Sequence, residues 1–569
     1  MSATYHFAYA ALSSVTFIVM GIVDAVFRLI YGRGRAVTKV KDPLLLLPAH
    51  TLANKIRARK LRAEDVMSAY IVRAKEVNPT VNAIVGEQYD GALQRAQELD
   101  IILDHLSPEQ IEEKYSVKQK PLLGVPLSVK EAFAWTGMSN TSGIPGRRHV
   151  RSTYDAPVLQ NLQEAGAIPF ILTNVSEACM WFESSNYVFG RTKNAYDNTR
   201  IVGGSSGGEG CVISCGASVI GIGSDIGGSI RMPCFFNGIF GHKPSIGVVE
   251  NRGQFPIASE KVMCMLQTGP MCRYASDLDL QLRVMAGLQG VAKLQLDTKV
   301  DLSKLRVMSV PDDAGGLMIS RMDPQLMEAQ RKVCEYLTSQ GAFVEERKFK
   351  KFRMALDMWS GLLNLSDDGP KFSAIIAGDD SKPVNCVTEI GKWLLGMSEH
   401  TLPALMLGVV DDFGPKLTKE MDKKAVKILE KLRAELLAEM LEEEREKQEK
   451  DGKIIQKDEE KSSNTGVNGS KHPMNGFKEK WQGTVLLYPT HPKIAPYHNH
   501  PIFTPFNFAY TGLFNALGFP VTQCPLGLSE EGLPLGLQVV AAPYQDHLSL
   551  AVARALEEKF GGWVSPGSW

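Results

Sequence analysis

Two glycine-rich segments, 203–210 and 223–231, constrain the fold of this chain more than any other feature. The first reads Gly-Gly-Ser-Ser-Gly-Gly-Glu-Gly and the second reads Gly-Ser-Asp-Ile-Gly-Gly-Ser-Ile-Arg. Glycine at this density allows backbone conformations that other residues rarely adopt, so we expect tight loops here. Apolar runs at 167–172 and 217–223 predict buried strands, and a helical pattern at 158–165 precedes the first of them. Strands that alternate with helices predict a layered α/β fold.

The bulk composition excludes several classes of protein. The 569 residues include 63 basic and 63 acidic side chains, so the formal net charge is zero. A protein that binds nucleic acid needs a basic excess to neutralise phosphates, and we therefore expect no nucleic-acid partner. The nine cysteines are odd in number and form no Cys-x-x-Cys pair. This pattern indicates reduced thiols in a cytosol-facing protein, and it argues against a disulfide framework or structural zinc.

The N-terminus predicts a membrane anchor. Residues 7–23 carry no charge, and apolar character continues to Ile30 past Asp24 and Arg28. A transmembrane helix needs about 20 apolar residues, so 7–30 is long enough to span a bilayer. Asp24 and Arg28 lie one helical turn apart, and we expect them to pair near the interface. A cleaved signal peptide and an interfacial helix are the alternatives.

The segment after the apolar stretch sets the expected topology. Basic residues at 33, 35, 39 and 41 follow it, and the positive-inside rule places such a flank in the cytoplasm. We therefore expect residues 1–41 to form a single-pass transmembrane anchor with a basic flank. Residues 42–569 then form one catalytic domain that faces the cytosol.

Three later segments complete the predicted organisation. Residues 416–441 have the apolar spacing of an amphipathic helix. Residues 442–480 are charged and polar with almost no large apolar side chains, which predicts a flexible surface insertion within the domain. The apolar stretches 393–397 and 402–410 are either ordinary core or a patch that faces a membrane.

The serines of the two glycine-rich loops indicate acyl-transfer chemistry. Cleaving an amide requires an activated nucleophile, donors for the oxyanion and a proton for the departing amine. Ser229 lies 24 residues after Ser205, in a loop whose glycines let backbone N–H groups converge on one point. Ser229 is the predicted nucleophile. The predicted oxyanion donors are the N–H groups of Ile226, Gly227, Gly228 and Ser229.

Lys130 is the predicted base. An exposed lysine has a pKa of about 10.4, but burial disfavours the charged amine and lowers that pKa. The preceding run, 125–129, is Val-Pro-Leu-Ser-Val and is apolar enough to predict burial. The Ser205 hydroxyl can donate to Lys130 while it accepts from Ser229, because a hydroxyl does both at once. The three side chains therefore predict a Ser-Ser-Lys proton relay that needs no histidine.

Other interpretations of the same residues remain open at this point. Residues 203–207 also match the Gly-x-Ser-x-Gly nucleophile elbow of an esterase, with Ser205 as nucleophile and His242 or His547 as base. Asp225 and Arg231 are more typical of a buried structural pair than of catalytic groups. A phosphate-binding role for the loops lacks the Gly-Lys-Ser/Thr or Gly-x-Gly-x-x-Gly context that such a site requires.

The segment 203–231 resembles the defining segment of the amidase signature family. The likeness extends through 124–130, 238–244, 515–520 and 532–538 and covers nearly all of residues 45–560. It implies a single large α/β/α sandwich around a mixed twisted sheet. It also implies a triad of Lys130, Ser205, which the family holds in a cis peptide, and Ser229. The intact triad argues against a catalytically inactive homologue.

Within that family the likeness is strongest to the membrane-anchored fatty-acid amide hydrolases, the second type in particular. It rests on the N-terminal apolar stretch, 179–181, 505–511 and 561–564. It implies hydrolysis of oleamide-like primary amides and N-acyl ethanolamines to fatty acid and amine, with Cys179 and Met180 near the substrate. It implies no metal and no organic cofactor, and it allows a homodimer. An enzyme for short or aromatic amides or esters is the alternative.

Overall fold

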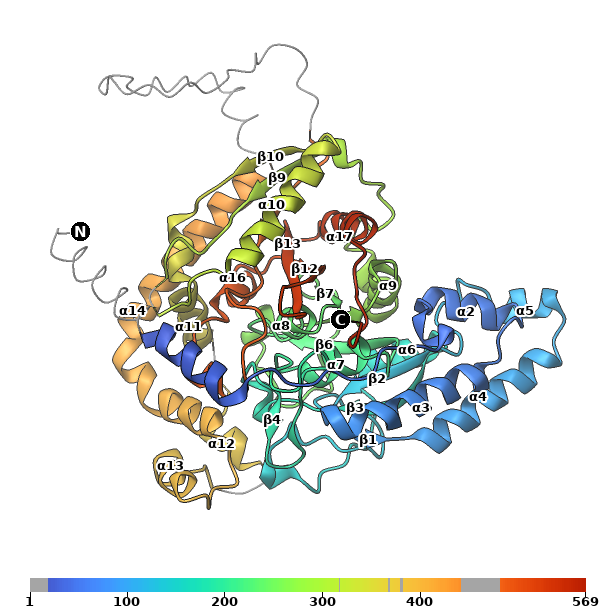
Figure 1. The fold of residues 1–569 in the computed structure, drawn as a ribbon, viewed down its shortest axis with the longest axis horizontal. Coiled ribbons are helices and arrows are strands. Elements are labelled where there is room, and N and C mark those ends of the chain that lie inside the picture. Colours follow the sequence, from blue (N-terminus) through green and yellow to red (C-terminus); the bar gives the residue numbers. More distant parts are fainter. Residues whose placement is uncertain (1–18, 317, 367–368, 379–381, 442–480, 569) are drawn as a thin grey trace, which may run out of the picture.

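A mixed β-sheet runs through the centre of the molecule (Figure 1). The computed structural model describes residues 19–316, 318–366, 369–378, 382–441 and 481–568. Within these ranges eleven strands lie in the order β1-β3-β2-β6-β8-β7-β12-β13-β11-β9-β10. Their bounds are β1 Ile84–Glu87, β2 Pro126–Lys130, β3 Ile168–Thr173, β6 Ile220–Asp225, β7 Phe240–Lys243, β8 Gln267–Cys272, β9 Leu305–Ser309, β10 Phe343–Glu346, β11 Gly483–Tyr488, β12 Val521–Leu528 and β13 Pro534–Ala541. Two short strands, β4 Ser185–Asn186 and β5 Gly190–Arg191, pair separately.

Helices cover both faces of the sheet. They are α2 Ala49–Arg57, α3 Ala63–Val81, α4 Tyr89–Asp104, α5 Pro108–Tyr115, α6 Pro157–Glu164, α7 Gly207–Ser214, α8 Arg231–Phe236, α9 Ala275–Val291, α10 Pro324–Ser339, α11 Ala355–Ser366, α12 Phe372–Ala377, α13 Cys386–Leu394, α14 Leu402–Leu441, α16 Ala509–Leu517 and α17 Asp546–Phe560. In Figure 1, α2–α5 lie on the right-hand side of the molecule and α11–α14 on the left.

The alternation of side chains along each strand explains why the sheet has a hydrophobic core on each face. Val539 of β13 belongs to the core cluster that includes side chains of α9, α10 and α17. Val540, the next residue, belongs to the cluster that includes side chains of α11, α14 and α16. Successive side chains of a strand point to opposite faces, so one strand supplies both cores. The sheet is parallel at β3-β2-β6 and β11-β9-β10 and antiparallel at β12-β13. The predicted α/β layers around a mixed sheet are confirmed.

The helix at residues 19–31 lies against the main body of the protein. Its Asp24 carboxylate accepts from Lys493 Nζ at 3.0 Å and lies 2.6 Å from His500 Nε2, and Phe27 packs edge-on against His500. The expected pair of Asp24 with Arg28 is therefore wrong. Docking turns Asp24 toward the domain, where two basic side chains from another segment reach it.

The predicted membrane span 7–30 lies partly outside the described residues, which begin at residue 19. Over the described ranges, no helix is both long enough and apolar enough to cross a bilayer. The transmembrane anchor therefore stays a prediction. The predicted insertion 442–480 also lies outside the described residues.

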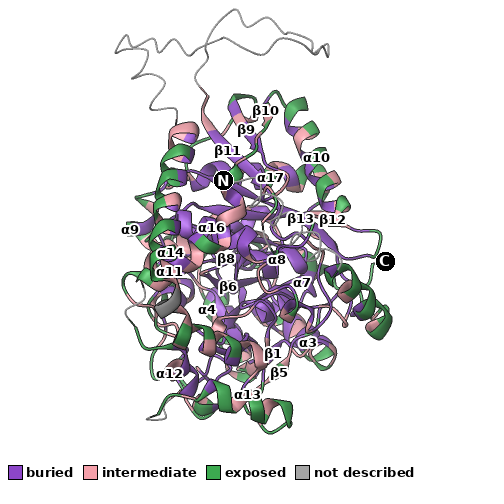
Figure 2. Ribbon diagram, turned by 90° about the vertical axis from the view of Figure 1, so that its left-hand side faces the viewer, coloured by how far each residue is buried: buried purple, intermediate pink, exposed green. Residues whose placement is uncertain are grey.

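The long amphipathic helix is present and extends further than its pattern predicts. It begins at Leu402 rather than residue 416 and ends at Leu441, as expected. The apolar stretch 393–397 is not core, because Leu394, Leu395 and Met397 are about 70% exposed. The stretch 402–410 divides between buried Leu405 and exposed Val410. Figure 2 shows α13 largely exposed at the periphery of the molecule, away from the buried centre of the sheet.

Candidate active site

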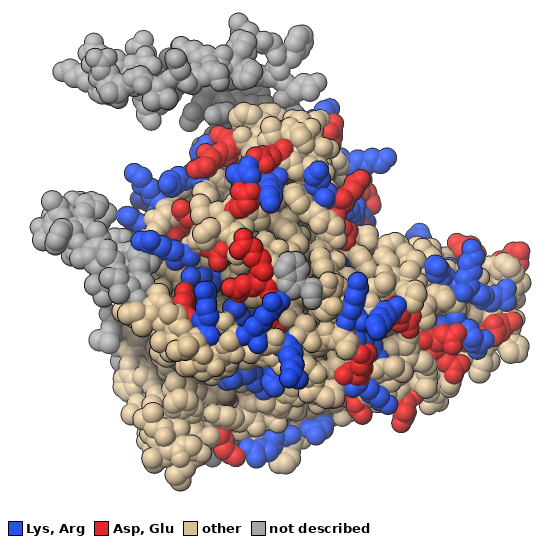
Figure 3. Space-filling view, in the orientation of Figure 1, with Lys and Arg blue, Asp and Glu red and all other residues tan. Residues whose placement is uncertain are grey.

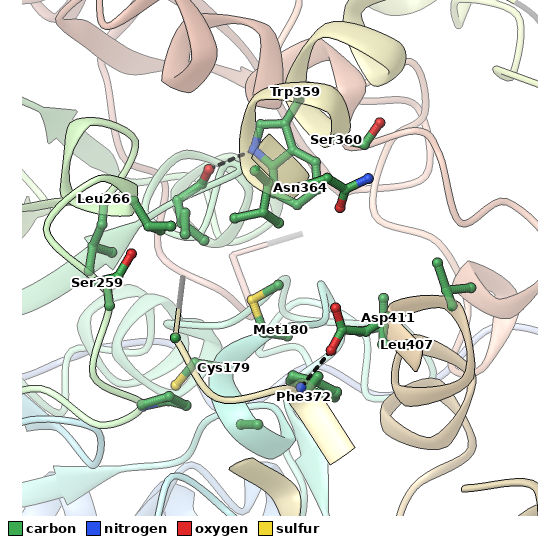
Figure 4. Close-up of a pocket in the computed structure, with 18 of the residues that line it drawn as sticks. Cys179, Met180, Ser259, Leu266, Trp359, Ser360, Asn364, Phe372, Leu407 and Asp411 are labelled. Carbon is green, nitrogen blue, oxygen red and sulfur yellow. Dashed lines mark hydrogen bonds between the residues drawn. The ribbon is translucent and has the colours of Figure 1, made fainter. Parts of the chain in front are cut away.

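A cavity of about 760 Å³ opens at the ends of β2 and β6. The predicted residues Ser205, Ser229, Ile226, Cys179 and Met180 all line it. Side chains from α11, α12 and α14 also line it: Trp359, Phe372, Leu407, Val410, Met421 and Ile428. Figure 4 labels Trp359, Phe372 and Leu407 among them. The fold therefore brings together the three loops that hold Cys179, Ser205 and Ser229, which are separated by up to 50 residues of sequence.

Lys130 is the last residue of β2, and its side chain is fully buried. Its Nζ lies 2.8 Å from Ser205 Oγ and 2.8 Å from Ser224 Oγ. Burial lowers the pKa of this amine, because a charged group loses its hydration in the protein interior. The neutral form of the amine carries a lone pair and can accept a proton. Ser224 was not predicted from the sequence, although it lies in the glycine-rich segment 223–231, directly before Asp225.

Ser205 follows a cis peptide bond to Gly204, in the turn that leads into α7. The turn is closely packed, because a Cβ atom on Gly204 would lie 2.4 Å from the Trp181 carbonyl oxygen. The N–H of Ser206 donates to the Ser229 carbonyl at 3.3 Å. This bond joins the two glycine-rich loops next to the cavity.

The Asp225 carboxylate organises the second loop. It accepts from the N–H of Gly228 at 2.7 Å and from the N–H of Ile230 at 3.1 Å. The Arg231 guanidinium donates to it through Nε at 3.0 Å and Nη2 at 2.9 Å. Burial would raise the pKa of Asp225, but the Arg231 charge and hydrogen bonds outweigh it and lower that pKa to about 2. The predicted buried structural pair is confirmed.

The oxyanion donors predicted from the sequence need one correction. The N–H of Gly228 is engaged by Asp225 and is not free to bind a substrate oxygen. The loop turns there with a φ of 126°, which favours glycine. The N–H groups of Ile226, Gly227 and Ser229 have no hydrogen-bond partner among the described residues. These three remain as donors that a bound oxyanion can use.

Cys179 and Met180 lie on the cavity wall, and Figure 4 shows both side chains beside the open space. Cys179 has a φ of 58°, in the left-handed region. Burial raises the pKa of its thiol, so the sulfur stays protonated at neutral pH. Both positions suit contact with a bound acyl chain, and a role in substrate binding stays a prediction.

The esterase interpretation lacks a base in the right place. His242 Nδ1 lies 2.9 Å from Thr522 Oγ1, and its Nε2 lies 3.1 Å from Asp546 Oδ1. His242 is fully buried, and the described lining of the cavity includes neither His242 nor His547. Lys130, in contrast, contacts the Ser205 hydroxyl directly. The geometry therefore favours lysine over histidine as the base.

Comparison with known proteins covers nearly the whole chain. The family described as Amidase matches residues 65–550. Fatty-acid amide hydrolase 2 of Homo sapiens is 46% identical over 534 residues, which cover 93% of this chain and 92% of that protein. Fatty-acid amide hydrolase 2-A of Danio rerio is 45% identical over 557 residues, which cover 96% of both chains.

Solved structures share the fold at lower identity. One named Fatty acid amide hydrolase matches with a TM-score of 0.66 at 22% identity, over 92% of this chain and 87% of its own. Another, titled Crystal structure of amidase, matches with a TM-score of 0.64 at 24% identity, over 90% and 100% of the two chains. The resemblance found in the sequence is thus confirmed. Since the family match spans both glycine-rich loops and Lys130, the chain belongs to the amidase signature family and is an amide-hydrolysing enzyme.

Proposed function

We propose that this enzyme hydrolyses fatty acid amides, with Ser229 as nucleophile, Ser205 as proton carrier and Lys130 as base. The observation that carries the catalytic assignment is the 2.8 Å approach of the buried Lys130 Nζ to Ser205 Oγ, beside the cavity that Ser229 also lines. A lowered pKa leaves a larger fraction of the amine neutral at a given pH. A neutral amine in contact with a hydroxyl is the arrangement that a relay requires.

The acylation step follows from these positions. Ser229 Oγ forms a bond to the acyl carbon, and the carbonyl π electrons move to the oxygen. The Ser229 proton passes to Ser205 Oγ as the Ser205 proton passes to Lys130 Nζ. When the tetrahedral adduct collapses, the C–N bond breaks and its electron pair stays on nitrogen. The proton returns from Lys130 through Ser205 to that nitrogen, which leaves as a neutral amine.

Water completes the reaction by the same route. Its oxygen adds to the acyl carbon of the Ser229 ester, while its proton passes through Ser205 to Lys130. Collapse of the second adduct breaks the bond to Ser229 Oγ, and the returning proton restores the Ser229 hydroxyl. The products are one carboxylic acid and one amine, and the three side chains end as they began. Lys130 acts first as a base and then as an acid in each half of the cycle.

The cavity supports an acyl chain as the bound group. Its volume of about 760 Å³ lies within the usual range for small-molecule sites. Apolar side chains such as Phe372, Leu407 and Ile428 line the cavity, and Figure 4 shows the first two. Relatives that are 45–46% identical over most of the chain are named fatty-acid amide hydrolases. Oleamide-like primary amides and N-acyl ethanolamines are therefore the substrates that we propose.

We also propose that the enzyme works at a membrane, anchored through its N-terminal apolar segment. Exposed apolar side chains of α13 and α14 would add a second contact, with Leu394, Leu395 and Met397 at its centre. Val410 of α14 is 64% exposed and also lines the cavity, so an exposed apolar residue lies at the substrate site as well. In the same orientation as Figure 1, few charged side chains cover the face over α12 and α13 (Figure 3). Lipid substrates partition into bilayers, so an entrance at such a face would admit them directly.

The test is release of fatty acid from oleamide and from an N-acyl ethanolamine by the full chain. Ser229→Ala should abolish release, since no hydroxyl remains to form the acyl-enzyme. Ser259→Ala is the matched control, because Ser259 lines the same cavity and its hydroxyl has no partner among the described residues. Retention of a tenth of the activity in Ser229→Ala would refute the nucleophile. A folded wild-type enzyme that cleaves short or aromatic amides but not these lipids would refute the substrate class.

A further inference from the structure

Trp359, on α11, connects a helix of the outer layer to the proposed oxyanion loop. Its indole Nε1 donates to the carbonyl oxygen of Ile226 at 2.8 Å, and Figure 4 shows this bond above the cavity. We infer that Trp359 is a positioning residue that aims the N–H of Gly227 at the oxyanion. This inference rests on the proposed serine mechanism and extends it to a helix that the catalytic motifs do not include.

The argument begins with the planar peptide bond. The carbonyl of Ile226 and the N–H of Gly227 belong to one rigid plane and point in opposite directions. A bond that holds the carbonyl toward Trp359 therefore fixes the direction of the Gly227 N–H. That N–H has no partner among the described residues, so it is available to a ligand.

The next peptide plane is held in the same manner, but its N–H is used differently. Thr511 Oγ1 donates to the Gly227 carbonyl at 2.6 Å, while the N–H of Gly228 donates to Asp225 at 2.7 Å. Both ends of that peptide are satisfied within the protein. The two peptides therefore differ in their N–H groups: Asp225 occupies the N–H of Gly228, whereas the N–H of Gly227 has no partner in the described part of the chain and takes its direction from the Trp359 bond.

Packing keeps the indole in place. Its ring meets Phe508 edge-on, with centroids 4.9 Å apart and planes at 80°. A Cβ atom on Gly227 would lie 3.4 Å from Phe508 and 3.5 Å from Trp359. These are ordinary van der Waals distances for an added atom, so both rings lie beside the loop at Gly227. An edge-to-face aromatic pair is a favourable arrangement, so the ring pair forms a stable support.

The bond from Trp359 should stabilise the transition state more than it stabilises the bound substrate. When Ser229 Oγ bonds to the acyl carbon, negative charge develops on the carbonyl oxygen, and directed donors stabilise it. Removal of one oxyanion donor lowers kcat by about 10²–10³-fold, and a misdirected donor should lose part of that. The substrate before reaction carries no such charge, so KM should change little.

The experiment replaces Trp359 with phenylalanine, which keeps an aromatic ring but removes the N–H. Hydrolysis of a p-nitrophenyl acyl ester measures the chemistry without depending on the lipid substrate class. We expect kcat to fall by about tenfold or more, with KM within about twofold. Binding of an acyl trifluoromethyl ketone, whose adduct with Ser229 carries the oxyanion, should weaken by a similar factor. Trp181→Phe is the matched control, because the Trp181 Nε1 has no partner among the described residues although it is buried.

A second variant separates hydrogen bonding from packing. Replacing Trp359 by 3-benzothienylalanine retains the bicyclic shape and exchanges only the N–H for sulfur, so it should show the same loss of kcat. An unchanged kcat in this variant, or a rise in KM with kcat preserved, would overturn the inference and leave Trp359 as a wall of the cavity. If Ser229→Ala kept full esterase activity, the failure would lie in the proposed mechanism instead.

Discussion

Replacing Arg231 with methionine should destabilise this enzyme strongly, because the guanidinium is a fully buried junction. It donates to Asp225 at 2.9 and 3.0 Å, to the Thr511 carbonyl at 2.9 Å, to Gln538 at 2.9 Å and to Asn515 at 2.5 Å. Methionine fills part of the volume but offers no donor. The variant therefore leaves one carboxylate and three neutral acceptors buried without the cation that satisfied them.

The magnitude can be worked from Asp225. Its pKa is about 2 in the folded protein against an ordinary value of 3.8. Because one pKa unit corresponds to about 1.4 kcal/mol, the difference amounts to about 2 kcal/mol of stability near neutral pH. Breaking a buried pair by removing one partner costs about 3–5 kcal/mol, since the remaining charge is uncompensated. We expect a loss toward the upper part of that range.

The pH dependence has a definite sign. In the wild type the Asp225 contribution is fully present above pH 3.8 and is lost as the pH falls toward 2. In the variant, burial without Arg231 raises the pKa of Asp225 above its unfolded value. The folded variant then binds the extra proton at mildly acidic pH, so the difference in unfolding free energy between wild type and variant should narrow as the pH is lowered from 7 toward 4.5.

Guanidinium-induced unfolding, followed by tryptophan fluorescence at pH 7 and pH 4.5, measures both effects. Arg148→Met is the control: Arg148 pairs with Glu399 at 2.8 Å, but the two side chains are 45% and 68% exposed. Such a surface pair is worth up to about 1 kcal/mol. A loss below 1 kcal/mol for Arg231→Met, or a loss that does not shrink at pH 4.5, would refute the reasoning.

Three further predictions concern the base and the membrane. Lys130→Met should lower kcat by about 10²–10⁴-fold and remove the rise of activity with pH that accompanies deprotonation of the wild-type amine, whose pKa is lowered by burial; a pH–rate profile that kept this rise would assign it to another group. Deleting residues 1–35 should reduce sedimentation with lipid vesicles while soluble esters are still hydrolysed, and full sedimentation would point to a second membrane contact. In that shortened form, Leu394→Ser with Leu395→Ser should reduce the remaining vesicle binding, whereas unchanged binding would argue against the α13 surface.

Local sequence patterns predicted the main elements well. The strands expected at 167–172 and 217–223 correspond to β3 and β6, and the helix expected at 158–165 corresponds to α6. These predictions succeeded because burial of a short apolar run and the spacing of an amphipathic helix depend on neighbouring residues. Helix ends depend on more than the local pattern: although proline often ends a helix, α3 continues past Pro79 to Val81 and ends at Asn82 with a φ of 50°. One proline in a last turn removes a single donor, and buried Val81 supports the extra residues.

The residues of the site could be predicted from the sequence, but their hydrogen-bond partners could not. Lys130, Ser205 and Ser229 carry chemistry that their local sequences already indicate, and the structure places Lys130 against Ser205. Asp225 is only three residues from Gly228, yet the hydrogen bond between them was not predicted. A glycine loop is equally compatible with a Gly228 N–H that donates to a substrate oxyanion. Asp24 shows the same limit, since its spacing from Arg28 did not reveal the partners on a distant segment.

By itself, the sequence determined the layered α/β architecture, the identity of the nucleophile and base that we propose, and the uncharged N-terminal stretch. Only the tertiary structure decided which donors face the cavity and what holds them there. Trp359 reaches Ile226 across 133 residues and Thr511 reaches Gly227 across 284. Such contacts arise when sheet and helices pack into one core, and packing depends on the shapes of all the side chains together. A local pattern specifies which side chain is present, whereas the direction of a peptide N–H depends on partners that only the folded chain brings near.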